Sequence, residues 1–220
     1  MEGAKNMKGP RPLKGELTAI VIIVLFHLVG LTGLLIPSLR QQFLQLVPYH
    51  LLLMMAIIIF SHQNLDGRLL LFVLCAFAAG YGVEWVGVNK HLLFGNYQYG
   101  QTLGFQLDHV PLIIGVNWFL LIYSAGVLMQ RSRIKSMLLR VLTGALILVL
   151  LDWLIEPVAM HLDYWHWAGG IIPPSNYYCW FFVSAFMLVL FEKFHFKKQG
   201  IVGPVLLGTQ FIFFITLYWL

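Results

Sequence analysis

Residues 137–160, MLLRVLTGALILVLLDWLIEPVAM, decide the class of fold. The run is long enough to cross a bilayer, whose hydrocarbon core takes about 20 apolar residues in a helix. Its apolar residues are continuous rather than alternating, so it fits a membrane helix and not a strand of a membrane β-barrel. Two acids, Asp152 and Glu156, interrupt its second half. Ionisable residues are costly inside a membrane, so these two acids are candidates for a functional site.

The rest of the chain repeats this pattern, and we expect a single integral membrane domain with an all-α, helical-bundle fold. Of its 220 residues, 60% are hydrophobic and 10% are charged, whereas about 25% are charged in ordinary soluble domains. The basic segment before the first run resembles a signal peptide, but the length of the run predicts a retained helix. Seven membrane spans are expected, at residues 17–35, 43–60, 69–88, 110–129, 137–160, 177–194 and 201–220.

Lysine and arginine predict the orientation of this bundle. Twelve of the 14 fall on one side of a seven-span chain, and only Arg40 and Lys90 fall on the other. Basic residues gather on the cytoplasmic side of membrane proteins, so we expect the N-terminus inside and the C-terminus outside. Because these residues sit at span ends and in short loops, the net charge of +5 does not indicate a nucleic-acid partner.

Polar residues near the outer ends of three spans predict a buried acid site. Glu84 lies in GYGVEWVGVN, and Asn117 lies in GVNWFLLIYS beside Trp118. Asp152 and Glu156 are four residues apart and therefore share one helix face. Carboxyl groups at one such depth cannot easily all be ionised, and a neutral carboxylic acid can donate a proton.

Two long loops, residues 89–109 and 161–176, lie at the same expected end and are rich in glycine, aromatic and amide side chains. Their Tyr97, Tyr99, Trp165 and Trp167 suit either an interfacial aromatic belt or a binding site. The polar residues within the spans also have a structural alternative, because such groups bond helices together. We expect no metal site, since the acids and histidines of residues 156–166 match no metal-binding spacing.

Five segments between Gly80 and Trp180 resemble a known family: EWVGVN, LLFGNYQYG, VPLIIGVNWFLLIYS, LDWLIEPVAMHLDYWHW and IPPSNYYCW. They are similar to the carotenoid biosynthesis membrane proteins of the CruF type, which are carotenoid hydratases of bacteria and haloarchaea. Members add water to the terminal 1,2 double bond of an acyclic ψ end group, in substrates such as lycopene, γ-carotene or bisanhydrobacterioruberin. The resemblance implies an enzyme without a cofactor in the bacterial cytoplasmic membrane. Its partners would be a carotenoid, water, the lipid bilayer and other enzymes of the pathway.

The resemblance and the polar residues together suggest roles. Asp152 or Glu156 would donate the proton, Glu84 would hold or deprotonate the water, and Asn117 would orient the acid or the water. Aromatic faces would stabilise the cationic intermediate, and the expected substrate-binding residues are Trp85, Trp118, Trp153, Trp165, Tyr97 and Asn96. Two alternatives stay open: a lycopene cyclase or other isoprenoid-modifying enzyme, and a carotenoid-binding membrane protein without activity.

Overall fold

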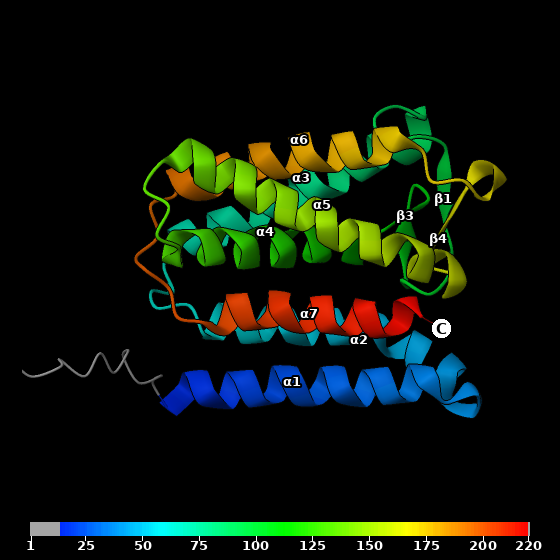
Figure 1. The fold of residues 1–220 in the computed structure, drawn as a ribbon, viewed down its shortest axis with the longest axis horizontal. Coiled ribbons are helices and arrows are strands. Elements are labelled where there is room, and N and C mark those ends of the chain that lie inside the picture. The colour runs from blue at the N-terminus through cyan, green and yellow to red at the C-terminus, as the bar shows by residue number, and fades with distance from the viewer. Residues whose placement is uncertain (1–13, 220) are drawn as a thin grey trace, which may run out of the picture.

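The computed structural model describes residues 14–219, and these form a bundle of seven helices with roughly parallel axes (Figure 1). Six helices are long and apolar enough to cross a membrane, and the last is apolar but shorter. The predicted helical membrane bundle is therefore confirmed. The helices are α1 Lys14–Leu35, α2 Pro37–Phe60, α3 Gly67–Lys90, α4 Ile113–Arg131, α5 Met137–His161, α6 Pro174–Lys193 and α7 Val202–Tyr218.

Local sequence explains where several helices begin. Pro37 opens α2 directly after α1, because proline at the first helical position loses no hydrogen bond. Asp66 caps α3 by accepting hydrogen bonds from the backbone N–H groups of Arg68 and Leu69. The fourth helix begins at Ile113, three residues later than predicted, because residues 110 and 111 form a strand instead.

Helix α4 forms the centre of the bundle. It packs against α2, α3, α5, α6 and α7, and nearly all of its side chains are buried. A helix that is apolar all round belongs in the interior, as expected. The surrounding helices expose large apolar side chains such as Leu70, Phe182 and Ile212 on their outer faces, and these faces suit contact with lipid.

Short strands join the two long loops at one end of the bundle (Figure 1). Strand β1 (Tyr97–Tyr99) pairs antiparallel with β4 (Trp165–Trp167), and β2 (Gln106–Leu107) pairs with β3 (Val110–Pro111). The first pairing places Tyr97 opposite Trp167 and Tyr99 opposite Trp165. It covers the end where α3 and α5 finish and where α4 and α6 begin, and so holds the two loops over the tips of these four helices.

The described chain begins and ends at opposite ends of the bundle (Figure 1). The strand pairs lie at the end where α7 finishes. Arg40 and Lys90 lie toward this end, while Arg68, Arg131 and Lys193 lie toward the opposite one. The charge asymmetry thus agrees with the seven-helix connectivity, and the assignment of the strand end to the outside of the cell stays a prediction.

Candidate active site

Three carboxyl groups meet beneath the strand pair. Glu84 comes from α3, and Asp152 and Glu156 come from α5; each side chain is at most 5% exposed. Together with Asn117 of α4 they line a small cavity of about 30 Å³. The four polar residues singled out in the sequence therefore lie around one space, although they come from three helices.

Glu84 is held by three hydrogen bonds. Its Oε2 atom accepts from the hydroxyl groups of Tyr97 (2.6 Å) and Tyr99 (2.7 Å), and its Oε1 atom accepts from Trp118 Nε1 (3.0 Å). Burial, and after it the nearby Glu84 carboxyl group, raises the pKa of both tyrosines well above the ordinary value. Both phenols therefore keep their protons and act as donors to Glu84.

Glu156 also accepts three hydrogen bonds. Its Oε2 atom receives the indole N–H groups of Trp165 (3.0 Å) and Trp167 (2.6 Å), and its Oε1 atom receives Asn176 Nδ2 (2.9 Å). Alternate residues of a strand point to the same side, so β4 aims both indoles at Glu156 as β1 aims both phenols at Glu84. One pair of three-residue strands thus supplies four donors to two carboxyl groups.

Asp152 has a different environment. Its Oδ2 atom accepts from Asn176 Nδ2 at 2.8 Å, so Asn176 bridges Asp152 and Glu156. Its Oδ1 atom is buried and has no hydrogen-bond partner among the described residues. Buried polar atoms are nearly always paired in proteins, so its unpaired carboxyl oxygen distinguishes Asp152 from the other two acids on the cavity wall.

A pair of stacked indoles lies beside the small cavity. The rings of Trp118 and Trp180 lie 4.2 Å apart between centroids, at 16° to each other, and Trp180 lines the small cavity. Gly80 of α3 makes this arrangement possible, because a Cβ atom there would overlap the side chain of Trp118. The stack presents aromatic faces beside the three carboxyl groups.

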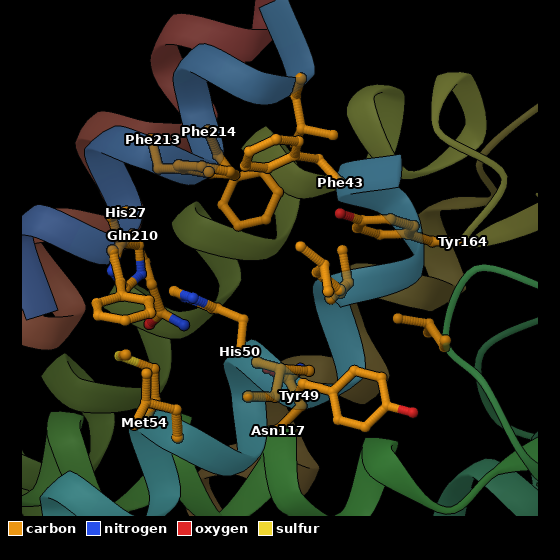
Figure 2. A pocket seen from close by; sticks show the side chains of 18 of the residues that line it. His27, Phe43, Tyr49, His50, Met54, Asn117, Tyr164, Gln210, Phe213 and Phe214 are labelled. Carbon is orange, nitrogen blue, oxygen red and sulfur yellow. The ribbon is translucent and has the colours of Figure 1, made fainter. Parts of the chain in front are cut away.

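A much larger cavity, of about 410 Å³, adjoins the small one. It lies among α1, α2 and α7 and is lined mostly by apolar side chains (Figure 2). Four residues line both cavities: Ile114, Asn117, Ile155 and Trp165. Asn117 thus stands between them, and its amide makes no hydrogen bond within the described chain.

Three of the residues expected to bind substrate lie elsewhere and line neither cavity. Trp85 donates to Asp108 Oδ2 at the bundle end (3.2 Å). Trp153 is 50% exposed and stacks on Tyr218. Asn96 has an exposed side chain, and its backbone carbonyl pairs with Ala168. Trp165 and Tyr97 line the small cavity, whereas Trp118 lines neither cavity but donates a hydrogen bond to Glu84.

Sequence reasoning missed Asn176 and Trp180 altogether. Both lie near the start of α6, in the segment PPSNYYCW, whose composition is ordinary for the edge of a membrane span. Asn176 could have been singled out as an amide at the start of the span that follows the two intramembrane acids. Nothing local distinguishes Trp180 from the other six tryptophans.

Comparisons with known proteins identify the family of the chain. The model of a family described as carotenoid biosynthesis protein matches residues 45–218, which include every residue around the small cavity. Bisanhydrobacterioruberin hydratase of Haloarcula japonica is 29% identical over 128 residues. That match covers 55% of this chain and 43% of the relative, so less than half of the relative's length is represented. No solved structure matches the chain.

Proposed function

This chain belongs to the family of carotenoid biosynthesis proteins, and we propose that it is a carotenoid hydratase. The proposed reaction adds water across the terminal 1,2 double bond of an acyclic ψ end group, as in lycopene or γ-carotene. One observation carries the proposal: a water-sized cavity ringed by three buried carboxyl groups adjoins a large apolar cavity. The first suits water and acid–base chemistry, and the second suits a hydrocarbon chain.

Hydration of an isolated double bond makes three demands on a protein. An alkene is a weak base, so a carboxylic acid must be held in a dry site to protonate it. Protonation at C-2 leaves a tertiary cation at C-1, which needs stabilisation by groups that do not attack it. One water molecule must then bond to C-1 and give up a proton. Addition of water leaves the oxidation level of the molecule unchanged, so the proposal includes no redox cofactor.

Asp152 is the proposed proton donor. Glu84 and Glu156 each accept three hydrogen bonds, and donors of this kind stabilise a carboxylate. Asp152 accepts one, and its Oδ1 atom is unpaired among the described residues. A proton on that oxygen would meet no competing hydrogen bond within the described chain, and Asp152 itself lines the small cavity. The bridging Asn176 would hold Asp152 in position beside Glu156.

The small cavity is the proposed water site. A cavity needs a volume of roughly 10–15 Å³ to hold one water, and the volume of this cavity is about 30 Å³. Glu84 on its wall would accept the proton that the water loses, and the unpaired Asn117 amide would orient the water toward the large cavity. Over the whole reaction, C-2 gains the proton of Asp152 and C-1 gains the hydroxide of the water molecule. The second proton of the water passes to Glu84 and then returns to Asp152.

Aromatic side chains would stabilise the cation. Trp118 and Trp180 stack beside the carboxyl groups, and Trp165 lines both cavities. A cation over an indole face gains about 2 kcal/mol or more when water is excluded. The indole N–H groups of Trp118 and Trp165 are bonded to Glu84 and Glu156, so neither ring is free to rotate away from the site.

A lycopene cyclase is the second candidate, because cyclisation starts with the same protonation. In a cyclase the cation is captured by a neighbouring double bond, and water must be kept out. Three carboxyl groups around a water-sized space favour capture by water instead. We further propose that the protein works in the bacterial cytoplasmic membrane, alongside other enzymes of the pathway.

Pigment analysis tests the proposal directly. The chain would be expressed in bacteria that accumulate lycopene and in others that accumulate γ-carotene, and extracts would be separated by chromatography with mass detection. A more polar product heavier by one water, with an unchanged chromophore, is expected. A product of unchanged mass would favour cyclisation, and unchanged pigment in both strains with the protein present in the membrane would contradict the hydratase. Asp152→Asn expressed to the same level is the matched control, because it keeps the shape of the side chain.

A further inference from the structure

Besides Asn117, which also lines the small cavity, three polar side chains lie on the mostly apolar wall of the large cavity. His27 of α1, His50 of α2 and Gln210 of α7 all line it (Figure 2). Each lies near the middle of its helix, and His27 and Gln210 are each 94% buried. Polar groups are expensive in the interior of a membrane bundle, so their presence on a hydrocarbon-lined wall needs an explanation.

The three residues converge. The rings of His27 and His50 meet edge to face, with centroids 4.6 Å apart. His27 also packs against Phe213, at 5.8 Å between ring centroids. Phe213 follows Gln210 by three residues on α7, so both lie on the helix face turned toward His27. Residues from three separate helices are thus brought to one part of the cavity wall.

Their hydrogen-bonding capacity is largely unused. His27 Nδ1 lies 2.8 Å from the backbone oxygen of Ile23; a carbonyl only accepts, so Nδ1 carries the proton and Nε2 of the neutral ring is left as an acceptor. The Oε1 atom of Gln210 is buried and has no partner among the described residues. His50 makes no hydrogen bond within the described chain either. Buried groups of this kind normally have partners, which points to a ligand that supplies them.

We propose that His27, His50 and Gln210 form a subsite for a hydroxyl group carried by the isoprenoid chain in the large cavity. A hydroxyl group both donates and accepts, and so matches an amide together with an imidazole acceptor. The described lining of the cavity contains no lysine, arginine or carboxyl group, so neither an anion nor a cation would be balanced there. This inference rests on the proposed function and deepens it, because the preferred substrate would already carry one oxygen.

The subsite therefore places the protein within a reaction sequence. A hydrocarbon chain gains a hydroxyl group only through an earlier hydration or oxygenation. An enzyme of one of those two classes must supply a substrate that uses the His27, His50 and Gln210 subsite.

Two small probes test the subsite: citronellol, and the matching alkene in which hydrogen replaces the hydroxyl group. Both carry the dimethyl-substituted double bond of an acyclic isoprenoid. Dissociation constants would be measured for the purified full chain in nanodiscs of fixed lipid composition, from the rise of the unfolding midpoint with probe concentration. Partition into lipid is the same for all variants, so it cancels when each variant's ratio of the two constants is compared with that of the wild type.

Gln210→Leu should weaken the binding of citronellol by about two- to tenfold, the usual worth of a net hydrogen bond, and leave the binding of the alkene unchanged. His50→Phe keeps the edge-to-face packing on His27 and should act in the same direction. Thr209→Val is the matched control: Thr209 is the adjacent residue on α7, bonds its own helix at Val205 and does not line the cavity. It should change neither constant.

An unchanged ratio in both Gln210→Leu and His50→Phe would overturn the subsite and leave a resident water as the partner of these groups. The hydratase proposal fails separately, through the pigment test. If the protein hydrates no carotenoid but the variants still lose affinity for citronellol, the hydroxyl subsite is retained and the hydratase proposal is rejected. If the protein hydrates lycopene but the ratio of the two dissociation constants is unchanged in the variants, the hydratase proposal is retained and the subsite is rejected.

Discussion

At the scale of single residues, the three carboxyl groups are not equivalent. Glu84 and Glu156 each accept three hydrogen bonds, whereas one oxygen of Asp152 has no partner among the described residues. An acid that must release its proton to carbon is better left without such donors, while a base that stays ionised benefits from them. The hydrogen-bond count therefore separates the proposed acid from the proposed base.

Amide substitutions test this assignment. Asp152→Asn should lower the turnover of a carotenoid by about 10²–10⁴, the usual contribution of general acid catalysis, with pigment binding retained. Asp152→Glu should recover part of the activity because it restores an acid. Asp108→Asn is the control, since Asp108 lies at the same end of the bundle but outside both cavities. The measurement is the initial rate of carotenoid turnover in membranes of equal protein content. Full activity of the Asp152→Asn variant would exclude Asp152 as the proton donor.

Trp180 provides a second test at this scale. Its ring lines the small cavity and stacks on Trp118, so Trp180→Leu should lower turnover by about thirtyfold if one cation–π contact of about 2 kcal/mol is lost. Trp180→Phe should retain more activity, because an aromatic face remains. Phe182→Leu, on the lipid-facing side of the same helix, controls for changes in α6. Equal activities in the leucine and phenylalanine variants at position 180 would argue against cation stabilisation.

Sequence alone identified the acids but not all of their partners. Glu84, Asp152 and Glu156 stand out because an ionisable residue inside an apolar membrane run is costly and usually has a function. Trp85 and Trp153, which the sequence analysis grouped with them, line neither cavity, although each directly follows an acid on a helix. Neighbouring helical residues point about 100° apart, so helical periodicity would have turned both indoles away from the site.

At the scale of elements, the contact between α3 and α4 sets the position of Trp118. Gly80→Ala would place a Cβ atom against that side chain and push the indole off Glu84. We expect a lower unfolding midpoint, since overpacking costs about 1–3 kcal/mol, together with a loss of turnover greater than the loss of folded protein. Gly82→Ala is the control, because a Cβ atom there meets no other atom within 4 Å. Unchanged turnover in folded Gly80→Ala would contradict a catalytic need for this placement.

The strands show where element prediction fails. The sequence predicted helices well because long apolar runs have few other stable forms in a membrane. Strands β1 and β4 are three residues each and lie more than 60 residues apart in the chain. No local periodicity predicts such a pairing, yet it supplies both tyrosines of Glu84 and both tryptophans of Glu156.

At the scale of the whole molecule, orientation in the membrane remains to be tested. The charge distribution predicts that the strand end faces outward. In a chain with Cys75 and Cys179 replaced by serine, Ile171→Cys should react with an impermeant maleimide in intact cells, because Ile171 is 74% exposed at that end. Arg133→Cys, at the opposite end, should react only after permeabilisation. The reverse pattern of labelling would invert the topology and leave the fold unchanged.

The large cavity also predicts how a carotenoid reaches the site. Phe26 and Val29 of α1 and Leu46 and Tyr49 of α2 line this cavity, yet they are 44–68% exposed. The cavity therefore opens between α1 and α2 on a flank that faces lipid, where a carotenoid would be dissolved. A rigid polyene could insert one end group through this opening while the rest of the chain stays in the bilayer.

Closing this opening should slow the reaction without altering the chemistry. Val29→Trp adds a large ring at the opening and should lower kcat/KM for a carotenoid, with the hydrogen bonds around Asp152 and Glu156 left intact. Leu28→Trp adds the same ring one residue away, where the side chain is exposed and lines neither of the two cavities, and should have little effect. Turnover of a short isoprenoid alkene should survive in Val29→Trp, because a small molecule needs a smaller opening. Equal losses for long and short substrates would place the route elsewhere, and equal losses in both tryptophan variants would mean that α1 affects the site through packing alone.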